Sequence, residues 1–130
     1  MTDIPLISIV DDDDTVRAAT ESLVKSLGFE TRTFASADSF LKSSSLSETR
    51  CLILDVQMPN MSGIELQDRL SNLGFEIPII FITAYPNDTA RQRALRAGAV
   101  AFLLKPFEVY GPRFVDSIRK ALKENKGRMP

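Results

Sequence analysis

The sequence predicts an α/β domain built on a doubly wound, five-stranded parallel sheet, and three observations lead to this expectation. Short apolar stretches alternate five times with stretches whose apolar residues recur at helical spacing. Capping residues and glycines mark where the helices begin and end. Short βαβ units with right-handed crossovers cover both faces of a parallel sheet with helices. The five expected strands are residues 6–10, 29–34, 51–54, 77–82 and 100–104.

The first expected helix follows a run of four aspartates, residues 11–14, and ends before Gly28. Asp13 and Asp14 are interpreted as solvated residues of the helix start, because carboxylates favour the positive end of the helix dipole. In the tetrapeptide Leu27-Gly28-Phe29-Glu30, the glycine predicts a helix C-cap and the phenylalanine a hydrophobic contact. The apolar stripe of this helix consists of Val16, Ala19, Leu23 and Leu27.

Residues 36–42 are expected to form a short second helix, and the serine-rich residues 43–47 a loop. The third helix is expected to start just after the loop that follows Asp55, because Ser62 and Glu65 have the spacing of a capping box. A repeat of the same tetrapeptide, Leu73-Gly74-Phe75-Glu76, predicts a second glycine C-cap. The apolar stripe of the third helix consists of Leu66, Leu70 and Leu73.

Residues 88–97 are the expected fourth helix, and Gly98 ends it. The last helix is expected to start near Arg113, because Pro112 suits a first helical turn. Its inner side is expected to consist of Phe114, Val115, Ile118 and Leu122. The chain ends soon afterwards, so residues 1–130 are expected to form a single domain.

Composition narrows the classes of function. The chain has 130 residues and a formal charge of -1, so it lacks the general basic character of a nucleic-acid-binding protein. No apolar stretch reaches the roughly 20 residues that span a bilayer, and the N-terminus lacks the basic start of a secretory signal. We therefore expect a cytoplasmic protein that binds neither membranes nor nucleic acid directly.

Cysteine and histidine usage excludes several kinds of chemistry. Cys51 is the only cysteine, so the chain has no internal disulfide or cysteine-built zinc site. Its place in an apolar run predicts an inert core thiol. The absence of histidine excludes Ser-His-Asp triads, histidine metal sites and a phosphohistidine carrier.

Polar side chains stand where the apolar strands end: Asp11 and Asp12, Asp55, Thr83, and Lys105. Ligands of open parallel sheets bind outside the carboxyl ends of the strands. Three carboxylates placed so close together repel one another unless a cation intervenes, and oxygen ligands with open water positions suit Mg²⁺. The set predicts phosphoryl transfer assisted by Mg²⁺ or by another divalent cation such as Mn²⁺.

Each of these residues, taken alone, has a simpler interpretation. Asp55 is as easily a turn residue before Met58-Pro59. Thr83 is more often a β-branched strand residue, and Lys105 a solvated cation. Their joint placement at strand ends favours a functional role for all three.

Several motifs occur together along the chain: Asp11-Asp12, Asp55, Met58-Pro59 with Ser62-Gly63, Thr83-Ala84, Ala97-Gly98-Ala99 and Lys105-Pro106-Phe107. In this order and spacing they resemble the receiver domain of bacterial response regulators, which belongs to the CheY-like superfamily. The likeness covers nearly the whole chain and implies the (βα)5 flavodoxin-like receiver fold. Val10-Asp11-Asp12-Asp13 and Lys105-Pro106-Phe107-Glu108 resemble the FixJ-like branch, whose members often carry a C-terminal helix-turn-helix domain.

The resemblance implies a Mg²⁺-dependent phosphoacceptor. Asp55 would accept a phosphoryl group from the phosphohistidine of a sensor histidine kinase and form an aspartyl phosphate. Asp12 and Asp55 would ligate Mg²⁺ directly, Asp11 through water, and Gln57 through its backbone carbonyl. The chain would catalyse only its own phosphorylation and dephosphorylation, so it is not expected to be an enzyme.

The resemblance also implies a switch in a two-component phosphorelay. Lys105 would pair with one phosphoryl oxygen, and the Thr83 hydroxyl would bond another. Phe102 matches the switch aromatic of the family, although a core Phe is its simpler interpretation. The face formed by the fourth helix, last strand and last helix would then change to control an output, with homodimerisation on phosphorylation. The family further suggests a cis bond between Lys105 and Pro106.

Two segments depart from the family pattern. Val109-Tyr110-Gly111-Pro112 lengthens the segment before the last helix, which leaves the geometry of a dimer open. Tyr85-Pro86 follows Thr83-Ala84, and Tyr85 is either a lid over the site or a loop-packing residue.

Three other functions compete with the switch. A haloacid-dehalogenase-like phosphatase also uses a strand-end Asp and Mg²⁺, but it needs a second Asp where this chain has Gln57. A flavodoxin-like carrier would need a phosphate-binding loop after the first strand, where four aspartates would repel phosphate. The third alternative is a receiver fragment of a longer DNA-binding transcriptional regulator.

Overall fold

A computed structural model describes residues 4–106 and 109–127 of the chain. Its five strands form one parallel sheet, as the sequence predicts, and their order is β2-β1-β3-β4-β5. The strands are β1 (Leu6–Val10), β2 (Glu30–Phe34), β3 (Cys51–Asp55), β4 (Ile79–Thr83) and β5 (Ala101–Leu104). The α-helices are α1 (Asp14–Ser26), α2 (Ala37–Leu41), α3 (Gly63–Asn72), α4 (Asp88–Arg96) and α5 (Pro112–Gly127), and a 3-10 helix, η1, spans Ser44–Ser47.

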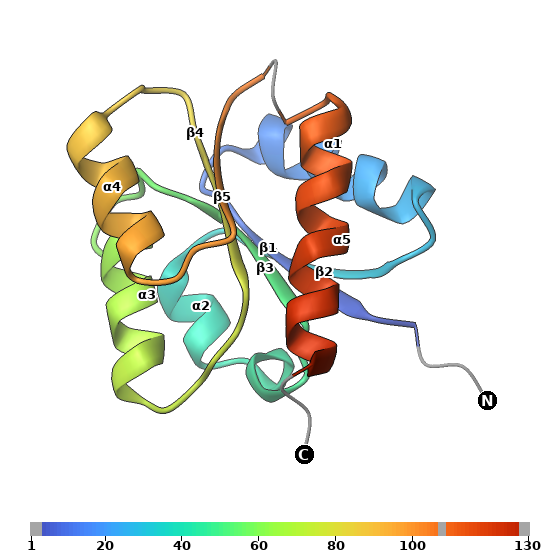
Figure 1. Cartoon of the computed structure of the whole chain (residues 1–130), viewed down its shortest axis with the longest axis horizontal. Helices are drawn as coiled ribbons and strands as arrows, with labels where there is room; N and C mark the ends of the chain where they lie inside the picture. The colour runs from blue at the N-terminus through green and yellow to red at the C-terminus, as the bar shows by residue number, and fades with distance from the viewer. Residues whose placement is uncertain (1–3, 107–108, 128–130) are drawn as a thin grey trace.

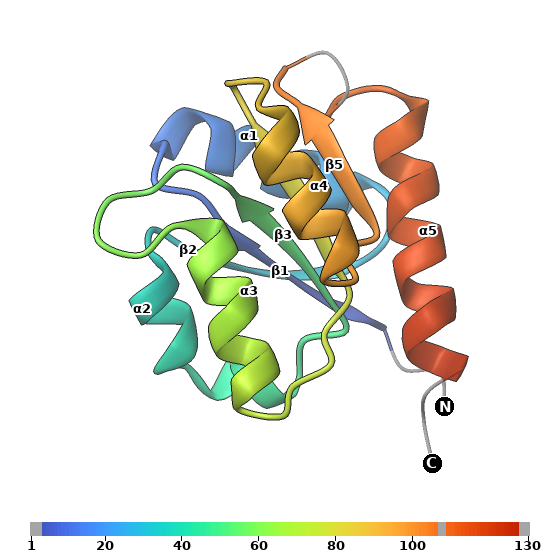
Figure 2. The ribbon, with the colours of Figure 1, turned by 60° about the vertical axis from the view of Figure 1, so that its left-hand side comes forward.

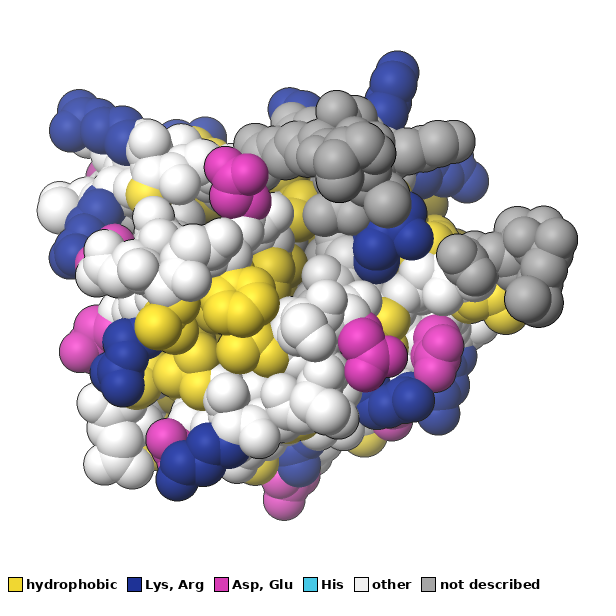
Figure 3. All heavy atoms as spheres, turned by 90° about the horizontal axis from the view of Figure 1, so that it is seen from below, with side chains coloured by type: hydrophobic (Ala, Val, Ile, Leu, Met, Phe, Trp, Pro, Cys, Tyr) yellow, Lys and Arg dark blue, Asp and Glu magenta, His cyan; other side chains and the backbone are white. Residues whose placement is uncertain are grey.

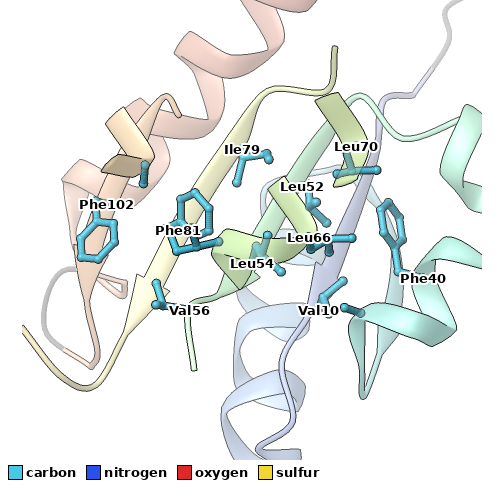
Figure 4. Packing of buried hydrophobic residues seen from close by; sticks show 13 residues of the cluster. Val10, Phe40, Leu52, Leu54, Val56, Leu66, Leu70, Ile79, Phe81 and Phe102 are labelled. Carbon is cyan, nitrogen blue, oxygen red and sulfur yellow. The ribbon is translucent and has the colours of Figure 1, made fainter. Parts of the chain in front are cut away.

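Helices cover both faces of the sheet. Figures 1 and 2 show α1 and α5 on one face and α2, α3 and α4 on the other. Alternate residues of each central strand face opposite sides, so Leu52 and Leu54 pack beneath α2 and α3 while Cys51 and Ile53 pack beneath α1 and α5. Figure 4 shows the first of these two clusters, in which the Phe40 side chain from α2 lies near Val10.

Helix caps lie where the sequence predicts them. The Asp13 side chain accepts hydrogen bonds from the first turn of α1, and Ser62 and Glu65 form both bonds of a capping box at α3. After α3, Gly74 has φ +87°, and the Phe75 N–H donates to the Leu70 carbonyl at 2.9 Å. The predicted glycine C-cap is therefore confirmed, with the Phe75 ring packed against the core.

The predicted stripes of α1 and α3 are wrong in part. The fully buried residues of α1 are Thr20 and Val24, whereas the predicted residues are only half-buried. Thr20 tolerates burial because its hydroxyl donates to the Val16 carbonyl at 2.7 Å. Leu73 is 58% exposed, because it is the C-cap residue of α3, where the chain turns away from the sheet.

Strand and helix limits differ from the prediction by one or two residues. β4 begins at Ile79 rather than residue 77 and includes Thr83, and β3 includes Asp55. α5 begins at Pro112 and buries Phe114 and Ile118 as predicted, together with Ala121. Val115 and Leu122 are half-buried.

The opposite edge of the sheet, where the strands begin, carries a small hollow. A cavity of about 170 Å³ is lined there by residues from the ends of α3 and α4 and the start of β4, among them Gln67, Phe75 and Ile77. Seen from below, the molecule shows hydrophobic side chains gathered between charged ones (Figure 3). No helix in the described part of the chain is both long and apolar enough to cross a membrane.

Candidate phosphoacceptor site

Three carboxylates meet at the carboxyl ends of β1 and β3. Val10 pairs with Leu54 in the sheet, so the residues that follow them, Asp11 and Asp55, lie next to each other. One oxygen from each of Asp11, Asp12 and Asp55 lies within 4.8 Å of the others. Asp11 and Asp55 are buried, and Asp12 is exposed. The sequence-predicted acids are therefore brought together, and their oxygen donors suit a hard divalent cation.

Lys105 extends from the end of β5 to two of these acids. Its ammonium nitrogen lies 2.9 Å from Asp11 Oδ2 and 3.4 Å from Asp55 Oδ1. Its backbone N–H donates to the Thr83 carbonyl at 2.8 Å, which ties the residue to β4. The peptide bond between Lys105 and Pro106 is cis, as the resemblance suggests. The lysine is thus a partly buried counter-ion of the acidic site.

The electrostatics of the site favour a further positive charge. Burial raises the pKa of Asp55 from 3.8 to about 7, and the nearby Asp11 carboxylate raises it too, while Lys105 opposes both effects. Burial alone would lower the pKa of Lys105, but the two carboxylates outweigh burial and raise it. Asp55 is thus harder to ionise than a free carboxyl group, and a cation that binds beside it would favour the ionised form.

Gln57 borders the same site, and Thr83 ends the neighbouring strand β4, its hydroxyl bonded to the residue after Ala84. The Thr83 side chain is buried at the end of β4, and its hydroxyl accepts from the Tyr85 N–H at 3.1 Å and donates to the Tyr85 carbonyl at 3.2 Å. A cavity of about 410 Å³ opens at the acids, with Gln57 and Tyr85 in its wall. Its lining consists of Asp12, Asp13, Asp55, Gln57, Ala84, Tyr85 and Lys105.

The family model of the response regulator receiver domain matches residues 7–119. The chain belongs to this family. Response regulator protein TodT of Pseudomonas putida is 45% identical over 118 residues, which cover 91% of this chain and 51% of TodT. Nodulation protein W of Bradyrhizobium diazoefficiens is 37% identical over 95% of this chain and 53% of that protein. This receiver chain spans about half the length of these curated relatives.

Solved structures show the same fold. The response regulator StyR superposes with a TM-score of 0.87 at 43% identity, over 97% of this chain and 63% of StyR. The structure titled FixJ-N has a TM-score of 0.81 at 34% identity, over 95% of this chain and 96% of that chain. The predicted receiver fold and the resemblance to FixJ-like proteins are confirmed.

Phe102 lies apart from the acids of this receiver. It is 8% exposed on β5, and its ring centroid is 6.0 Å from that of Phe81 on the neighbouring strand. Phe102 is thus part of the core beneath α4, as its simpler interpretation holds.

Two residues that support the site, Gly63 and Arg17, are not predicted from the sequence in that role. A Cβ on Gly63 would lie 2.3 Å from the Asp55 carbonyl oxygen, so α3 contacts the acceptor strand closely only because this residue lacks a side chain. Arg17 donates to the Asp11 carbonyl. The sequence places Gly63 only in a family motif, and its position directly after the cap residue Ser62 is the available signal. No periodicity singles out Arg17.

Proposed function

We propose that this receiver is a phosphorylation-activated switch of a two-component system, with Asp55 as its phosphoacceptor and a sensor histidine kinase as its partner. The observation that carries this proposal is the placement of Asp55 at the rim of an open cavity, between two other acids and Lys105. Phosphoryl transfer depends on positioning and charge neutralisation, and the site supplies groups for both.

The chemical step begins with the ionised Asp55 carboxylate. One of its oxygens attacks phosphorus, the bond between phosphorus and the donor's histidine nitrogen breaks, and the electron pair leaves with that nitrogen. The product is an acyl phosphate on Asp55. Lys105, which already pairs with Asp55, would remain beside it as the partner of a phosphoryl oxygen. The Thr83 hydroxyl would bond another phosphoryl oxygen.

The acidic residues fit Mg²⁺ or Mn²⁺. The carboxylates of Asp11, Asp12 and Asp55 and the backbone carbonyl of Gln57 would hold the ion, with Asp11 acting through water. A divalent ion there supplies charge neutralisation for the transferring group. The raised pKa of Asp55 supports this assignment, because a site that resists ionisation in the metal-free protein gains most from a cation.

The output would come from the face formed by α4, β5 and α5. We propose that the phosphorylated state moves Thr83 toward Asp55 and Phe102 after it, and that this face then controls an output, with homodimerisation as one response. The protein would act in the cytoplasm, without direct contact to nucleic acid or membrane. It would not be an enzyme, since it would catalyse only its own phosphorylation and dephosphorylation.

A second candidate is a receiver that works within a longer DNA-binding regulator. The observation in its favour is that the chain matches about half of proteins named transcriptional regulators, such as TdiR of Thauera aromatica, which is 38% identical over 120 residues. Sequencing the gene on both sides of these residues tests it. An added helix-turn-helix region would support this candidate, and its absence would count against it.

The test of the phosphoacceptor is intact mass after incubation with acetyl phosphate and Mg²⁺. The unmodified protein should gain one phosphoryl group, and the Asp55→Asn variant should gain none. Asp13→Asn is the matched control, because Asp13 lines the same cavity but caps α1, a role that Asn also fills. A phosphoryl gain by Asp55→Asn would overturn the assignment.

A further inference from the structure

The guanidinium group of Arg17, on α1, contacts the acidic loop after β1 at two points. Its Nη1 donates to the Asp11 backbone carbonyl at 2.8 Å, and its Nη2 lies 2.5 Å from Asp14 Oδ1. The Arg17 side chain is 20% exposed, so much of it is packed against the protein. A planar guanidinium makes two such contacts in fixed directions, which an ammonium does not.

The two contacts are made by residues on either side of Asp12 in the sequence, Asp11 and Asp14. Asp12 is exposed and sits between Asp11 and Asp13 in a run of four carboxylates that repel one another. Asp11 is held by its N–H bond to the Phe34 carbonyl, and its side chain accepts from the Asp13 N–H. Arg17 connects the Asp11 backbone to the first turn of α1, where the loop ends.

We infer that Arg17 is a positioning residue for the cation site: it holds the loop so that the Asp12 carboxylate stays within reach of Asp11 and Asp55. This inference rests on the proposed Mg²⁺ site. Arg17 would not contact the ion, and it acts through the backbone between the two acids. Groups that orient metal ligands without touching the metal have measurable effects on metal affinity.

The sign of the effect separates positioning from simple charge. A positive side chain beside a cation site repels the cation, so removing only its charge would raise Mg²⁺ affinity. If Arg17 instead holds the loop, its removal lowers Mg²⁺ affinity despite the loss of that repulsion. Arg17→Lys keeps the charge and loses the fork, and therefore isolates the geometric contribution.

Calorimetric Mg²⁺ titrations of Arg17→Ala and Arg17→Lys test the inference. We expect both variants to bind Mg²⁺ about tenfold more weakly than the unmodified protein, at the lower end of the range for ligand-orienting groups. Lys25→Ala is the control, because it removes the same charge from the same helix at an exposed ion pair with Glu21. The Mg²⁺ affinity of Lys25→Ala should stay within about twofold of the unmodified protein, since solvent and salt screen the interaction between the exposed Lys25 charge and the cation site.

Unchanged or tighter binding by Arg17→Lys would overturn the inference. Amide exchange of the metal-free protein gives an independent readout: the Asp13 N–H, bonded to Asp11 Oδ1, should exchange faster in Arg17→Lys and not in Lys25→Ala. Equal exchange would also count against a loop-holding role. If the unmodified protein bound no Mg²⁺, the proposed cation site would fail instead, and the exchange comparison would still test the loop.

Discussion

The hydroxyl of Thr83 is bonded at both its donor and its acceptor positions to the backbone of Tyr85, at 3.2 and 3.1 Å. A phosphoryl oxygen on Asp55 would compete for the hydroxyl proton that Thr83 now donates to the Tyr85 carbonyl. Exchange of that bond would free the Tyr85 peptide and thereby change the loop that leads into α4. Thr83 would thus couple the chemistry of the site to the backbone after β4.

Thr83→Val tests this coupling. The variant keeps the shape of the side chain but leaves the Tyr85 N–H without its acceptor, which we expect to cost about 1–2 kcal/mol of stability. In the unmodified protein, a phosphoryl mimic should shift amide NMR signals at residues 91–96 and 102–105. In Thr83→Val the mimic should cause smaller shifts of these signals, because the hydroxyl that would exchange the Tyr85 carbonyl for a phosphoryl oxygen is absent. Thr83→Ser retains a hydroxyl and serves as the control; full shifts in Thr83→Val would contradict the coupling.

Tyr85→Ala should shorten the life of the phosphorylated state. Tyr85 is 63% exposed and lines the cavity beside Asp55, where we expect it to obstruct the path of water to an acyl phosphate. We expect faster loss of phosphate from purified phosphoprotein, with Mg²⁺ affinity nearly unchanged. Tyr85→Phe keeps the ring and should behave as the unmodified protein. An equal or longer half-life in Tyr85→Ala would show that the ring packs elsewhere and is not a lid.

Asp55→Asn should stabilise the metal-free protein in a pH-dependent way. The folded pKa of Asp55 is raised to about 7, so between pH 3.8 and 7 the unfolded state loses a proton that the folded state keeps. The stability of the unmodified protein therefore falls across this window, and the neutral amide avoids that loss. Above pH 7 we expect the free energy of unfolding of Asp55→Asn to be higher by about 2 kcal/mol. This is about half the energy equivalent of the pKa shift, because water that reaches the open site screens the charge.

Chemical denaturation with a chelator present, repeated from pH 4 to 8, measures this gain. The difference between the Asp55→Asn variant and the unmodified protein should vanish near pH 4. Asp38→Asn removes an exposed carboxylate of α2 and should show no such trend. A gain that is independent of pH would refute the electrostatic origin.

Gly63→Ala should damage both stability and phosphorylation. The added methyl group would meet the Asp55 carbonyl, so α3 or the acceptor strand must shift, at a cost of about 1–3 kcal/mol. Gly74→Ala is a matched control: it is strained by a φ of +87° but has open space around it. Thermal melts should show losses in both variants, whereas slower phosphorylation by acetyl phosphate should appear only in Gly63→Ala. Equal phosphorylation rates would mean that the contact does not position Asp55.

Much of this fold and site is visible in the sequence because it depends on local patterns. Strand ends in a parallel sheet share one edge, so Asp11, Asp55 and Lys105 could be placed together without knowing any distance. Caps such as that of α3 depend on residues only three positions apart. The roles of Thr83 and Phe102 depended on the resemblance, since neither residue type identifies a switch.

Other features depend on contacts between segments and carry no periodic signal. The buried line of α1 runs through Thr20 and Val24, because the tilt of the helix on the sheet decides which of two adjacent lines faces inward. Leu73 has the spacing of the apolar stripe of α3, but it is the C-cap residue and lies beyond the last turn of that helix. The approach of Gly63 to Asp55 and the reach of Arg17 to the Asp11 carbonyl are likewise set by tertiary packing.

Helix α4 buries few side chains against the core, and this limits the free energy needed to move it. Ala94 is the one residue of this described helix that is fully buried, and Ala90 packs against the same cluster, so the apolar surface that α4 buries is small and its fully buried methyl group is worth about 1 kcal/mol. Coupling between two sites in a protein is typically about 1–3 kcal/mol. Moving α3, which buries Leu66 and Leu70, would exceed that amount. We therefore expect that a single covalent event on Asp55 could reshape the flank formed by α4 while the other helices keep the domain folded.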